Sequence, residues 1–327
     1  MVYRTIKGEE KMNPTQFDSI DSAFVFALSN VLQNGHEVNS RVGRTRECIG
    51  AQFIFQDVNH TFLLNKRRKL SPYYACAETL WYLSFTNSIE MIKAYAPQYE
   101  KFADEAGNTN GAYGYRFWHN LSSEENQLDL VINTLRKHPN SRQAIVTLWE
   151  ADDLNAAVNA SSKDVPCTLS LQYIIRDGQL HAITTMRSND AWLGFPYDVF
   201  AFTCIQRLIA QALGIRCGGY IHQVGSFHIY EKHWVAARES LDKIQLFQNS
   251  MPIWPDETLE DYNLTIKKCI KAEECVRKNI PYTTSFATDG TSEMMFDLVA
   301  TASHKWQGGS PLTTSAQLLK GIQNVNN

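Results

Sequence analysis

The sequence has little excess charge of either sign. Lys and Arg together number 31 and Asp and Glu 34, which gives a formal net charge of −3. This balance offers no electrostatic footprint for a nucleic acid, so we expect no nucleic-acid partner. The one basic run, Lys66-Arg67-Arg68-Lys69, precedes Leu70-Ser71-Pro72. A solvated turn is the favoured interpretation of this run, and a phosphate or RNA patch is the alternative.

Long apolar runs and metal-type cysteine spacing are also missing. No run approaches the ~18 apolar residues of a membrane span, and the start MVYRTIKGEEKMNP lacks the apolar core of a signal peptide. The seven cysteines include no CxxC pair, and their odd number favours reduced thiols over disulfides. We therefore expect a cytoplasmic protein, in the host cytoplasm if the sequence is viral, with no metal and no membrane partner.

The composition is that of a globular enzyme, and apolar periodicity predicts a mixture of helices and strands. A chain of 327 residues suffices for one large domain or two small ones, and its 44% hydrophobic and 20% charged shares are ordinary. The run 197–213 is apolar on nearly all sides, which predicts a central buried helix with Cys204 in the core. Further helices are predicted at residues 21–33, 73–83, 234–247 and 264–277 and after the capping-box pattern Ser122-Ser123-Glu124-Glu125, and strands at 50–56, 60–65, 144–149 and 219–230.

Residues 165–197 carry the most informative pattern in the chain. Two runs of alternating apolar and polar residues, 169–175 and 180–185, flank Asp177-Gly178, a pair typical of a two-residue hairpin turn. With this pair as the turn, Cys167 lies opposite Ser188 and beside Arg187. A β-bulge could shift the pairing by one or two residues without separating the cysteine from the arginine.

The hairpin would therefore place a nucleophile next to an anion-binding side chain. A guanidinium such as that of Arg187 lowers the pKa of a neighbouring thiol and can bind a phosphate through two hydrogen bonds. A buried structural Cys167 with the arginine in a surface ion pair is the alternative. From the hairpin alone this alternative is favoured, since free cysteine is among the most buried residue types.

Motifs in and around the hairpin resemble those of the thymidylate synthase family. The order and spacing of these motifs identify the chain as a member over residues 20–255. The matching motifs are Ser40-Arg41-x-Gly43, Glu78-x-x-Trp81, Pro166-Cys167, Arg187-Ser188-x-Asp190, Leu193-Gly194-x-Pro196 and Gly225-x-x-His228-x-Tyr230-x-x-His233.

The resemblance implies an α+β fold of the thymidylate synthase type. We expect a mixed β-sheet, a buried central helix, and a homodimer formed through a face of the sheet. The expected organisation is an N-terminal arm at 1–18, a catalytic domain at 19–255, and a divergent C-terminal segment at 256–327 packed on the same domain. The hydrophobic C-terminal tail that closes over the folate in the family is not recognisable in LLKGIQNVNN.

Glu78 lies within the largely apolar run 73–83. An unpaired carboxylate in such surroundings has a raised pKa, and a carboxylate of this kind can shuttle protons. The alternative is that Glu78 lies on the solvent-exposed edge of the helix. The resemblance implies that Glu78 is the general acid/base, which acts through ordered water.

The resemblance also implies binding roles for several other side chains. His228 and Tyr230 lie two apart on a predicted strand, so they face the same side and can hold the 3′-hydroxyl of the sugar. Where the family has a pair of arginines that reach across the dimer, this chain has Arg142 and Gln143. The implied phosphate ligands are Arg41, Arg187, Ser188 and Arg142 of the partner subunit; the implied folate contacts are Asp190, Tyr99, Phe102 and Gly194, and Tyr113 lies in a matching loop near the cysteine.

Members of the family attach a one-carbon unit from 5,10-methylenetetrahydrofolate to C5 of a pyrimidine nucleotide. A thiolate, here that of Cys167, adds to C6 and makes C5 nucleophilic. C5 attacks the iminium form of the folate, and loss of the C5 proton and of the folate leaves an exocyclic methylene. Hydride from the folate then gives a methyl group and dihydrofolate, whereas water gives a hydroxymethyl group and tetrahydrofolate.

Asp198 is the position that bears on the base. Thymidylate synthases have asparagine there, which donates to uracil O4 and accepts from N3–H. An ionised aspartate only accepts, so it suits the N4 amino group of cytosine and a protonated N3. A helix N-terminal residue favoured by the dipole is the alternative, and the two are compatible. The substitution resembles the deoxycytidylate hydroxymethylases, a branch found in viruses that hypermodify their DNA.

Other departures also favour a branch outside the thymidylate synthases. Tyr99 and Phe102 replace tryptophans that help position the folate, and smaller rings there could admit water. We predict a dCMP 5-hydroxymethyltransferase; the alternatives are reductive C5-methylation of dCMP or dUMP, and a nucleotide-binding regulator without turnover. The remaining departures are Thr168 in place of a histidine, Met186 in place of a glutamine and Ser226 in place of an aspartate.

Overall fold

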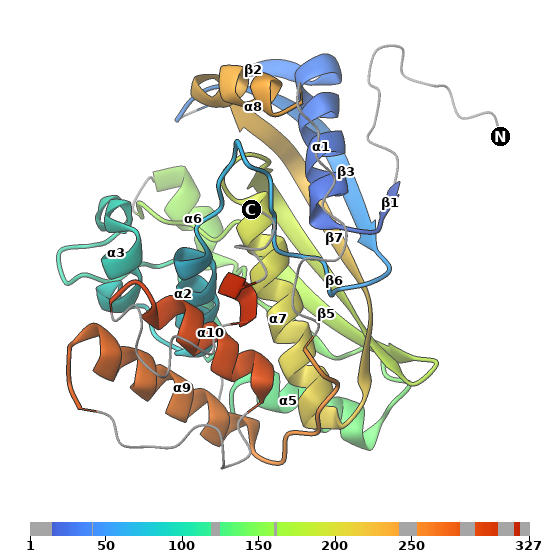
Figure 1. Ribbon diagram of the computed structural model, residues 1–327. Coiled ribbons are helices and arrows are strands. Elements are labelled where there is room, and N and C mark those ends of the chain that lie inside the picture. The colour runs from blue at the N-terminus through green and yellow to red at the C-terminus, as the bar shows by residue number, and fades with distance from the viewer. Residues whose placement is uncertain are drawn as a thin grey trace.

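The fold is a mixed sheet with helices against it, seen in a computed structural model (Figure 1). The structure describes residues 15–40, 42–118, 125–159, 162–241, 254–281, 292–306 and 317–320. The sheet has the order β1-β3-β7-β6-β5-β4, with β2 paired to β3 outside this path. β1 with β3 and β6 with β7 are parallel and the other pairs antiparallel, so the predicted mixed sheet is confirmed. The strands are β1 Thr15–Phe17, β2 His36–Ser40, β3 Gly43–Phe55, β4 Ile145–Thr147, β5 Thr168–Arg176, β6 Gln179–Asp190 and β7 Arg216–Tyr230.

Helix α7, Phe195–Leu213, is the predicted central helix. All but two of its residues are buried, and it packs along β6 and β7 and against α2 (Figure 1). Cys204 is buried within it, as expected. Towards the C-terminus, α10 packs against α2 and α9. The other helices are α1 Ile20–Asn34, α2 Pro72–Leu83, α3 Glu90–Tyr95, α4 Tyr113–Arg116, α5 Gln127–Lys137, α6 Asp152–Asn159, α8 Trp234–Leu241, α9 Tyr262–Arg277 and α10 Glu293–Ser303, with 3₁₀ turns η1 Pro97–Lys101 and η2 Glu231–His233.

The hairpin of β5 and β6 forms as predicted but with a bulge near its open end. Asp177 and Gly178 have φ of 51° and 70°, as a primed turn requires. The expected pairing holds from the turn to Ser170 and Thr185, and then shifts by one residue so that Thr168 pairs with Met186. Cys167 therefore lies opposite Arg187, whose N–H donates to the Cys167 carbonyl at 2.8 Å, and not opposite Ser188.

Two local predictions are wrong. Residues 60–65 form no strand: Phe62 and Leu63 are both buried, whereas neighbours in a strand point to opposite sides. The N–H of Leu64 is satisfied instead by the carboxylate of Asp21, at 3.2 Å from each oxygen.

Helix α5 begins at Gln127, later than the serine-rich pattern suggested, because the capping box is formed by Asn126 and Asp129. Ser122, Ser123 and Glu124 lie outside the described residues.

One face of the sheet is left without a covering helix by the described part of the chain. Along β5, β6 and β7, buried residues alternate with half-buried ones, and the helices in Figure 1 lie on the buried side. Ile54, Ile221 and Ile183 stand in register across three neighbouring strands on the other side and are half-buried. Ile49 on β3 is 57% exposed. A single chain does not test the predicted dimer, and the three-part division of the chain also stays a prediction.

Within the described ranges, no helix is long and apolar enough to cross a membrane.

Candidate active site

Arg187 holds the chain around Cys167 in place. Its guanidinium donates to the carbonyls of Pro166 and Val165, at 2.9 and 3.0 Å, and to Ser188 Oγ at 3.1 Å. Ser188 Oγ lies 3.7 Å from the Cys167 sulfur, so it can donate a weak hydrogen bond to it. The structure thus brings the predicted nucleophile together with two of the predicted phosphate ligands.

The Cys167 thiol is partly buried, and burial raises its pKa above the ordinary value. The charge of Arg187 and the Ser188 hydroxyl act in the opposite direction. The predicted lowering by arginine is therefore present but is outweighed by burial. Burial therefore favours the protonated thiol, and Arg187 beside it favours the thiolate.

Tyr113 lies next to the cysteine, as expected. Its hydroxyl accepts a hydrogen bond from the N–H of Thr168 at 3.3 Å. Its ring packs against Tyr82 of α2 and Phe202 of α7, with centroids 5.0 and 6.0 Å apart. The bulged end of the hairpin is thereby fastened to both helices.

Glu78 is buried on α2 and is held by tyrosine hydroxyls. The hydroxyls of Tyr74 and Tyr99 both donate to its Oε1, the latter at 3.0 Å. Burial raises the pKa of Glu78 to about 7, although the hydroxyl donors lower it. This burial excludes the interpretation of Glu78 as a solvent-exposed residue on the edge of the helix. A carboxyl group with a pKa near neutrality can accept and release protons.

Asp198 is buried in the first turn of α7. The Asn189 amide donates to its Oδ2 at 2.7 Å. Burial first, and then the nearby charge of Glu78, raise the pKa of Asp198 well above its ordinary value. Asp198 is thus both a residue of the helix N-terminus and a carboxyl group close to Glu78.

Asp190 ends β6 and organises the following turn. Its Oδ1 accepts from the N–H groups of Trp192 and Leu193, at 2.8 and 3.0 Å. Its Oδ2 is buried without a hydrogen-bond partner in the described part of the protein. A buried acceptor of this kind is costly unless a ligand or water donates to it.

Arg68 also contacts the turn that follows β6. Its Nε donates to the Trp192 carbonyl at 2.5 Å, and its guanidinium lies 5.7 and 5.4 Å from the ring centroids of Trp192 and Tyr197. The interpretation of the basic run as fully solvated is therefore wrong for this arginine. Its planar group packs on aromatic faces and is only partly exposed.

His228 and Tyr230 lie on one side of β7, as the two-residue spacing predicts. Both are half-buried, and their ring centroids are 5.1 Å apart at an angle of 88°. His228 is in register with Asp190 on the parallel strand β6. The pair therefore lies beside the end of β6 that carries Arg187 and Ser188, the neighbours of the predicted nucleophile.

Other predicted phosphate ligands are not assembled within one chain. Arg142 is exposed and forms no hydrogen bond or ion pair through its side chain with the described site residues. Arg41 lies outside the described residues. Arg44 and Arg46, which follow it on β3, form ion pairs with Glu37, so their charges are already partnered.

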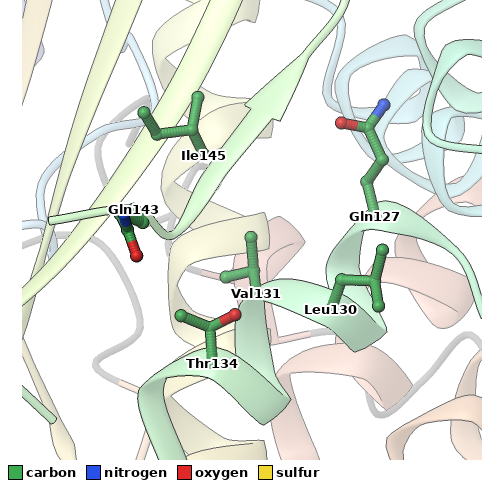
Figure 2. Close-up of a pocket in the computed structure, with 6 residues that line it drawn as sticks. All are labelled: Gln127, Leu130, Val131, Thr134, Gln143 and Ile145. Carbon is green, nitrogen blue, oxygen red and sulfur yellow. The ribbon is translucent and has the colours of Figure 1, made fainter. Parts of the chain in front are cut away.

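Two hollows are lined by none of the predicted catalytic residues Cys167, Glu78 and Asp198. Phe102, 45% exposed, lines a cavity of about 550 Å³ together with Asp104, Asp152 and Lys163. Its carboxylate-rich wall is unsuited to a phosphate. The second hollow, of about 100 Å³, lies between α5 and the segment entering β4. Figure 2 shows residues that line it, among them Gln143 and Ile145. It contains none of the predicted catalytic residues.

Among the described residues, no cluster of three or more His, Cys, Asp or Glu side chains could hold a metal ion. The seven cysteines all lie in described segments and are all free.

Several side chains of the site were missed by the sequence analysis. Tyr74 stands one helical turn before Glu78, a spacing that could have revealed it. Asn189 and His222 carried no such signal, because they meet only through the pairing of β6 with β7. The residues missed are Arg68, Tyr74, Tyr82, Asn189 and His222.

Comparison with known proteins agrees with this geometry. A family model described as thymidylate synthase matches residues 22–269. The structure is also similar to that of a thermostable thymidylate synthase A from Bacillus subtilis, with a TM-score of 0.65 and 26% sequence identity. The match covers 76% of this chain and 93% of that one. The matched region includes Glu78, Cys167, Arg187 and Asp198.

Proposed function

This chain belongs to the thymidylate synthase family, and on that premise we propose that it is a deoxycytidylate 5-hydroxymethyltransferase. At family level the activity is one-carbon transfer to a pyrimidine nucleotide, with 5,10-methylenetetrahydrofolate as co-substrate. The observation that carries the finer proposal is a buried carboxyl group, Asp198, close to Glu78 and in the same region as Cys167.

In this proposal Cys167 adds to C6 of the base. The thiol gives its proton to water on substrate binding, when the guanidinium of Arg187 stabilises the thiolate. Arg187 also fixes the backbone before the cysteine through Val165 and Pro166. The same guanidinium and Ser188 Oγ bind the substrate phosphate, which ties substrate binding to the position of the nucleophile.

Glu78 moves protons during the later steps. With a pKa of about 7, the carboxyl group is present in both forms near neutral pH. It accepts the C5 proton through ordered water and returns one when the folate nitrogen leaves. The folate leaves as tetrahydrofolate and an exocyclic methylene remains at C5. Water then adds to this methylene, and cleavage of the bond between Cys167 and C6 releases 5-hydroxymethyl-dCMP.

Asp198 recognises the base. In its ionised form it accepts from the N4 amino group of cytosine and from a protonated N3, and a cationic N3 makes C6 a better target for Cys167. The same carboxylate would face uracil O4 with a second acceptor, an unpaired contact that costs about 1–3 kcal/mol.

The folate lies against Tyr99, Phe102, Asp190 and Gly194. The partnerless Oδ2 of Asp190 supplies an acceptor for an N–H group of the pterin ring. Tyr99 takes the place of a tryptophan, and the smaller ring leaves room for the water that attacks the methylene. Its hydroxyl, which a tryptophan lacks, reaches Glu78.

The enzyme acts as a homodimer formed through the uncovered face of the sheet. Ile54, Ile183 and Ile221 present an apolar row on that face. The exposed Arg142 then reaches the phosphate of the other subunit, and His228 with Tyr230 holds the 3′-hydroxyl. Arg41 is the fourth phosphate ligand in this proposal.

The test is product analysis by mass spectrometry after incubation with methylenetetrahydrofolate and dCMP, CMP or dUMP. We expect dCMP to gain one CH₂O unit. A gain of CH₂ alone would mean that the exocyclic methylene accepts hydride and not water, and it would overturn the water-capture step. If product forms from dUMP and not from dCMP, the assignment of Asp198 as the residue that recognises cytosine is overturned. An Asp198→Asn variant is the matched control, and we expect its preference to move towards dUMP.

Reductive methylation of dUMP is the second candidate, and one observation favours it. The raised pKa of Asp198 favours its neutral form in the free protein. A neutral carboxyl group can donate to uracil O4 and accept from N3–H, as an asparagine does. The same incubation distinguishes the two candidates, since this one gives dTMP and dihydrofolate.

A further inference from the structure

The chain on either side of Cys167 is tied to the residues at and just before the start of α4. Before the cysteine, the N–H of Gly111 donates to Oδ2 of Asp164 at 3.0 Å. After the cysteine, the N–H of Thr168 donates to the hydroxyl of Tyr113 at 3.3 Å. The proposed nucleophile therefore lies between two contacts to the same short segment.

The contact between Asp164 and Gly111 does not depend on the protonation state of the carboxyl group. A backbone N–H can only donate, so the carboxyl oxygen accepts; when the group is neutral, its proton lies on the other oxygen. In the described part of the chain, no other donor forms a hydrogen bond to this carboxyl group. The side chain of Asp164 is therefore positioned by a single hydrogen bond.

The carboxyl group occupies the space that a side chain at position 111 would need. A Cβ atom on Gly111 would lie 2.6 Å from Asp164 Oδ2 and 2.8 Å from its Cγ. The φ angle of Gly111 is outside the left-handed region, so the backbone conformation alone would permit a side chain. The close approach of Asp164 is therefore what makes a glycine necessary at this position.

The segment that holds Asp164 is anchored by a buried ion pair. Arg116 Nε donates to the carbonyl of Asn110 at 2.9 Å, and Arg116 Nη2 lies 2.8 Å from Asp153 Oδ1. Arg116 and Asp153 are both buried, and a buried polar network with its hydrogen bonds formed is rigid. Asp164 is thus attached to a fixed part of the protein.

We propose that Asp164 is a positioning residue for Cys167, which fixes through Gly111 the direction in which the sulfur meets C6 of the base. The proposal rests on the function proposed above, in which Cys167 is the nucleophile. Arg187 holds the two carbonyls between Asp164 and Cys167 but is also proposed to bind the phosphate. Asp164 adds an anchor that does not touch the substrate, so its loss should slow the attack on C6 without weakening phosphate binding.

The attack on C6 can be measured without folate. The thiolate of Cys167 adds to C6, C5 takes up a deuteron from D₂O, and loss of the original C5 proton to solvent with departure of the thiolate restores the base. The base then carries deuterium at C5. Exchange at C5 of dCMP, followed by NMR, therefore reports on the nucleophile and not on the folate site. A Cys167→Ala variant gives the background.

We expect the exchange rate to fall about tenfold or more in Asp164→Ala and in Gly111→Ala, with deoxyribose 5-phosphate bound as in the wild type. The double variant should be no slower than Asp164→Ala, because the added methyl group no longer meets a carboxyl group. Asp164→Asn is the conservative variant, since its amide oxygen can still accept from Gly111. It also removes a charge that adds to burial in raising the pKa of Cys167, so it should keep the wild-type rate or exceed it.

Asp104→Ala is the matched control. The Asp104 carboxylate also accepts backbone hydrogen bonds in the chain before α4, from Ala106 and Asn108 at 2.9 and 2.8 Å. It makes no contact with the stretch before Cys167, so the exchange rate of this variant should equal that of the wild type.

The outcomes separate this proposal from the function on which it rests. Exchange that is absent from the wild type, or that persists in Cys167→Ala, overturns the nucleophile and with it the proposed function. Exchange of dUMP and not of dCMP overturns only the assignment of Asp198, and the same variants are then compared on dUMP.

Other outcomes overturn the role of Asp164 alone. These are a wild-type rate in both Asp164→Ala and Gly111→Ala, or an equal fall in Asp164→Asn or Asp104→Ala. A loss of deoxyribose 5-phosphate binding that matches the loss of exchange would show a general structural role and would also overturn it. If Asp164→Ala or Gly111→Ala fails to fold, the other variant decides.

Discussion

The hydroxyl of Tyr99 donates a hydrogen bond to Oε1 of Glu78, with 3.0 Å between the oxygens. Tyr74 donates to the same oxygen, and the two hydroxyls are 3.1 Å apart. Each donor stabilises the ionised carboxylate, while burial opposes it, and the pKa of Glu78 settles at about 7. A residue proposed to contact the folate is thereby joined to the residue proposed to move protons.

Replacing Tyr99 by phenylalanine should raise the pKa of Glu78 above about 7, because one of its donors is lost. The steps that need ionised Glu78 then require a higher pH. We expect the rising limb of kcat/KM against pH to move to higher pH, with activity at pH 7 reduced by about 2–10-fold. Steady-state kinetics between pH 5 and 9 would check this.

Tyr95→Phe is the matched control for that experiment. Its hydroxyl donates to a different buried carboxylate, that of Glu273, at 2.8 Å. The rising limb of kcat/KM against pH should be the same in Tyr95→Phe as in the wild type. A Tyr99→Phe profile that coincides with the wild type would show that Glu78 is not the group that titrates.

A Tyr99→Trp variant tests the entry of water into the folate site. The larger ring should exclude the attacking water and favour hydride transfer, so the methyl share of the product should rise at the expense of hydroxymethyl. Quantifying both products from dCMP gives the ratio directly. An unchanged ratio would remove the argument from Tyr99, while the one from Asp198 would stand.

Much of the fold could be predicted because local chemistry and tertiary packing agree. Asp177-Gly178 and the alternation of the flanking runs determine the hairpin register from Ser170 to Thr185. The bulge beyond it could not be predicted, since it depends on contacts such as that between Thr168 and Tyr113. The strand predicted at 60–65 failed for a similar reason: Asp21, more than forty residues away, satisfies the backbone there.

The candidate site divides in the same way. Cys167, Arg187 and Ser188 could be predicted together because one hairpin carries them. Asn189 and His222 are 33 residues apart and meet only because β6 and β7 pair in parallel. No local pattern in the sequence indicates such a pairing, so the contact between these two side chains can be seen only in the structure.

An Arg187→Lys substitution should weaken both roles proposed for this arginine. Lysine keeps the charge but lacks the planar group that reaches Val165, Pro166 and Ser188 together. We expect the KM for dCMP to rise about tenfold or more and the Cys167 thiol to react more slowly with iodoacetamide near neutral pH. A Cys167→Ala variant gives the background from the other thiols. Unchanged alkylation would show that Arg187 does not assist the thiolate.

Asp21→Asn should change how stability depends on pH. Burial raises the pKa of Asp21 to about 7, while in the unfolded chain it is near 3.9. The native state therefore holds this proton more tightly, and wild-type stability should fall as the pH rises from about 4 through 7. The variant avoids this loss and should be more stable than the wild type at pH 8, by roughly 1–4 kcal/mol.

Urea denaturation at pH 5 and pH 8 would measure the effect of Asp21→Asn. The asparagine oxygen can still accept from the Leu64 N–H, so the variant keeps that contact. Asp18→Asn, at an exposed aspartate nearby, is the control and should show no such gain. A gain that is the same at both pH values would contradict the titration of Asp21 as its cause.

The shared phosphate site can be tested by mixing two inactive variants. Arg142→Ala removes the side chain proposed to act on the other subunit, and Cys167→Ala removes the nucleophile of its own site. In a mixed dimer, the Cys167 of one chain meets the Arg142 of the other, so one of the two sites is intact. After denaturation and refolding of an equal mixture, we expect about a quarter of wild-type activity, since half of the dimers are mixed and each has one working site.

The location of the subunit interface is tested in the same experiment. Ile49→Glu places a charge on the uncovered sheet face, where Ile49 is 57% exposed in one chain. If this face joins the subunits, burying an unpaired charge there opposes association, and the mixture should regain no activity when both variants carry it. Recovery without Ile49→Glu and its loss with the substitution would together support a dimer through the sheet. Activity that is absent from the simple mixture, although the refolded protein is dimeric by light scattering, would show that Arg142 serves its own subunit.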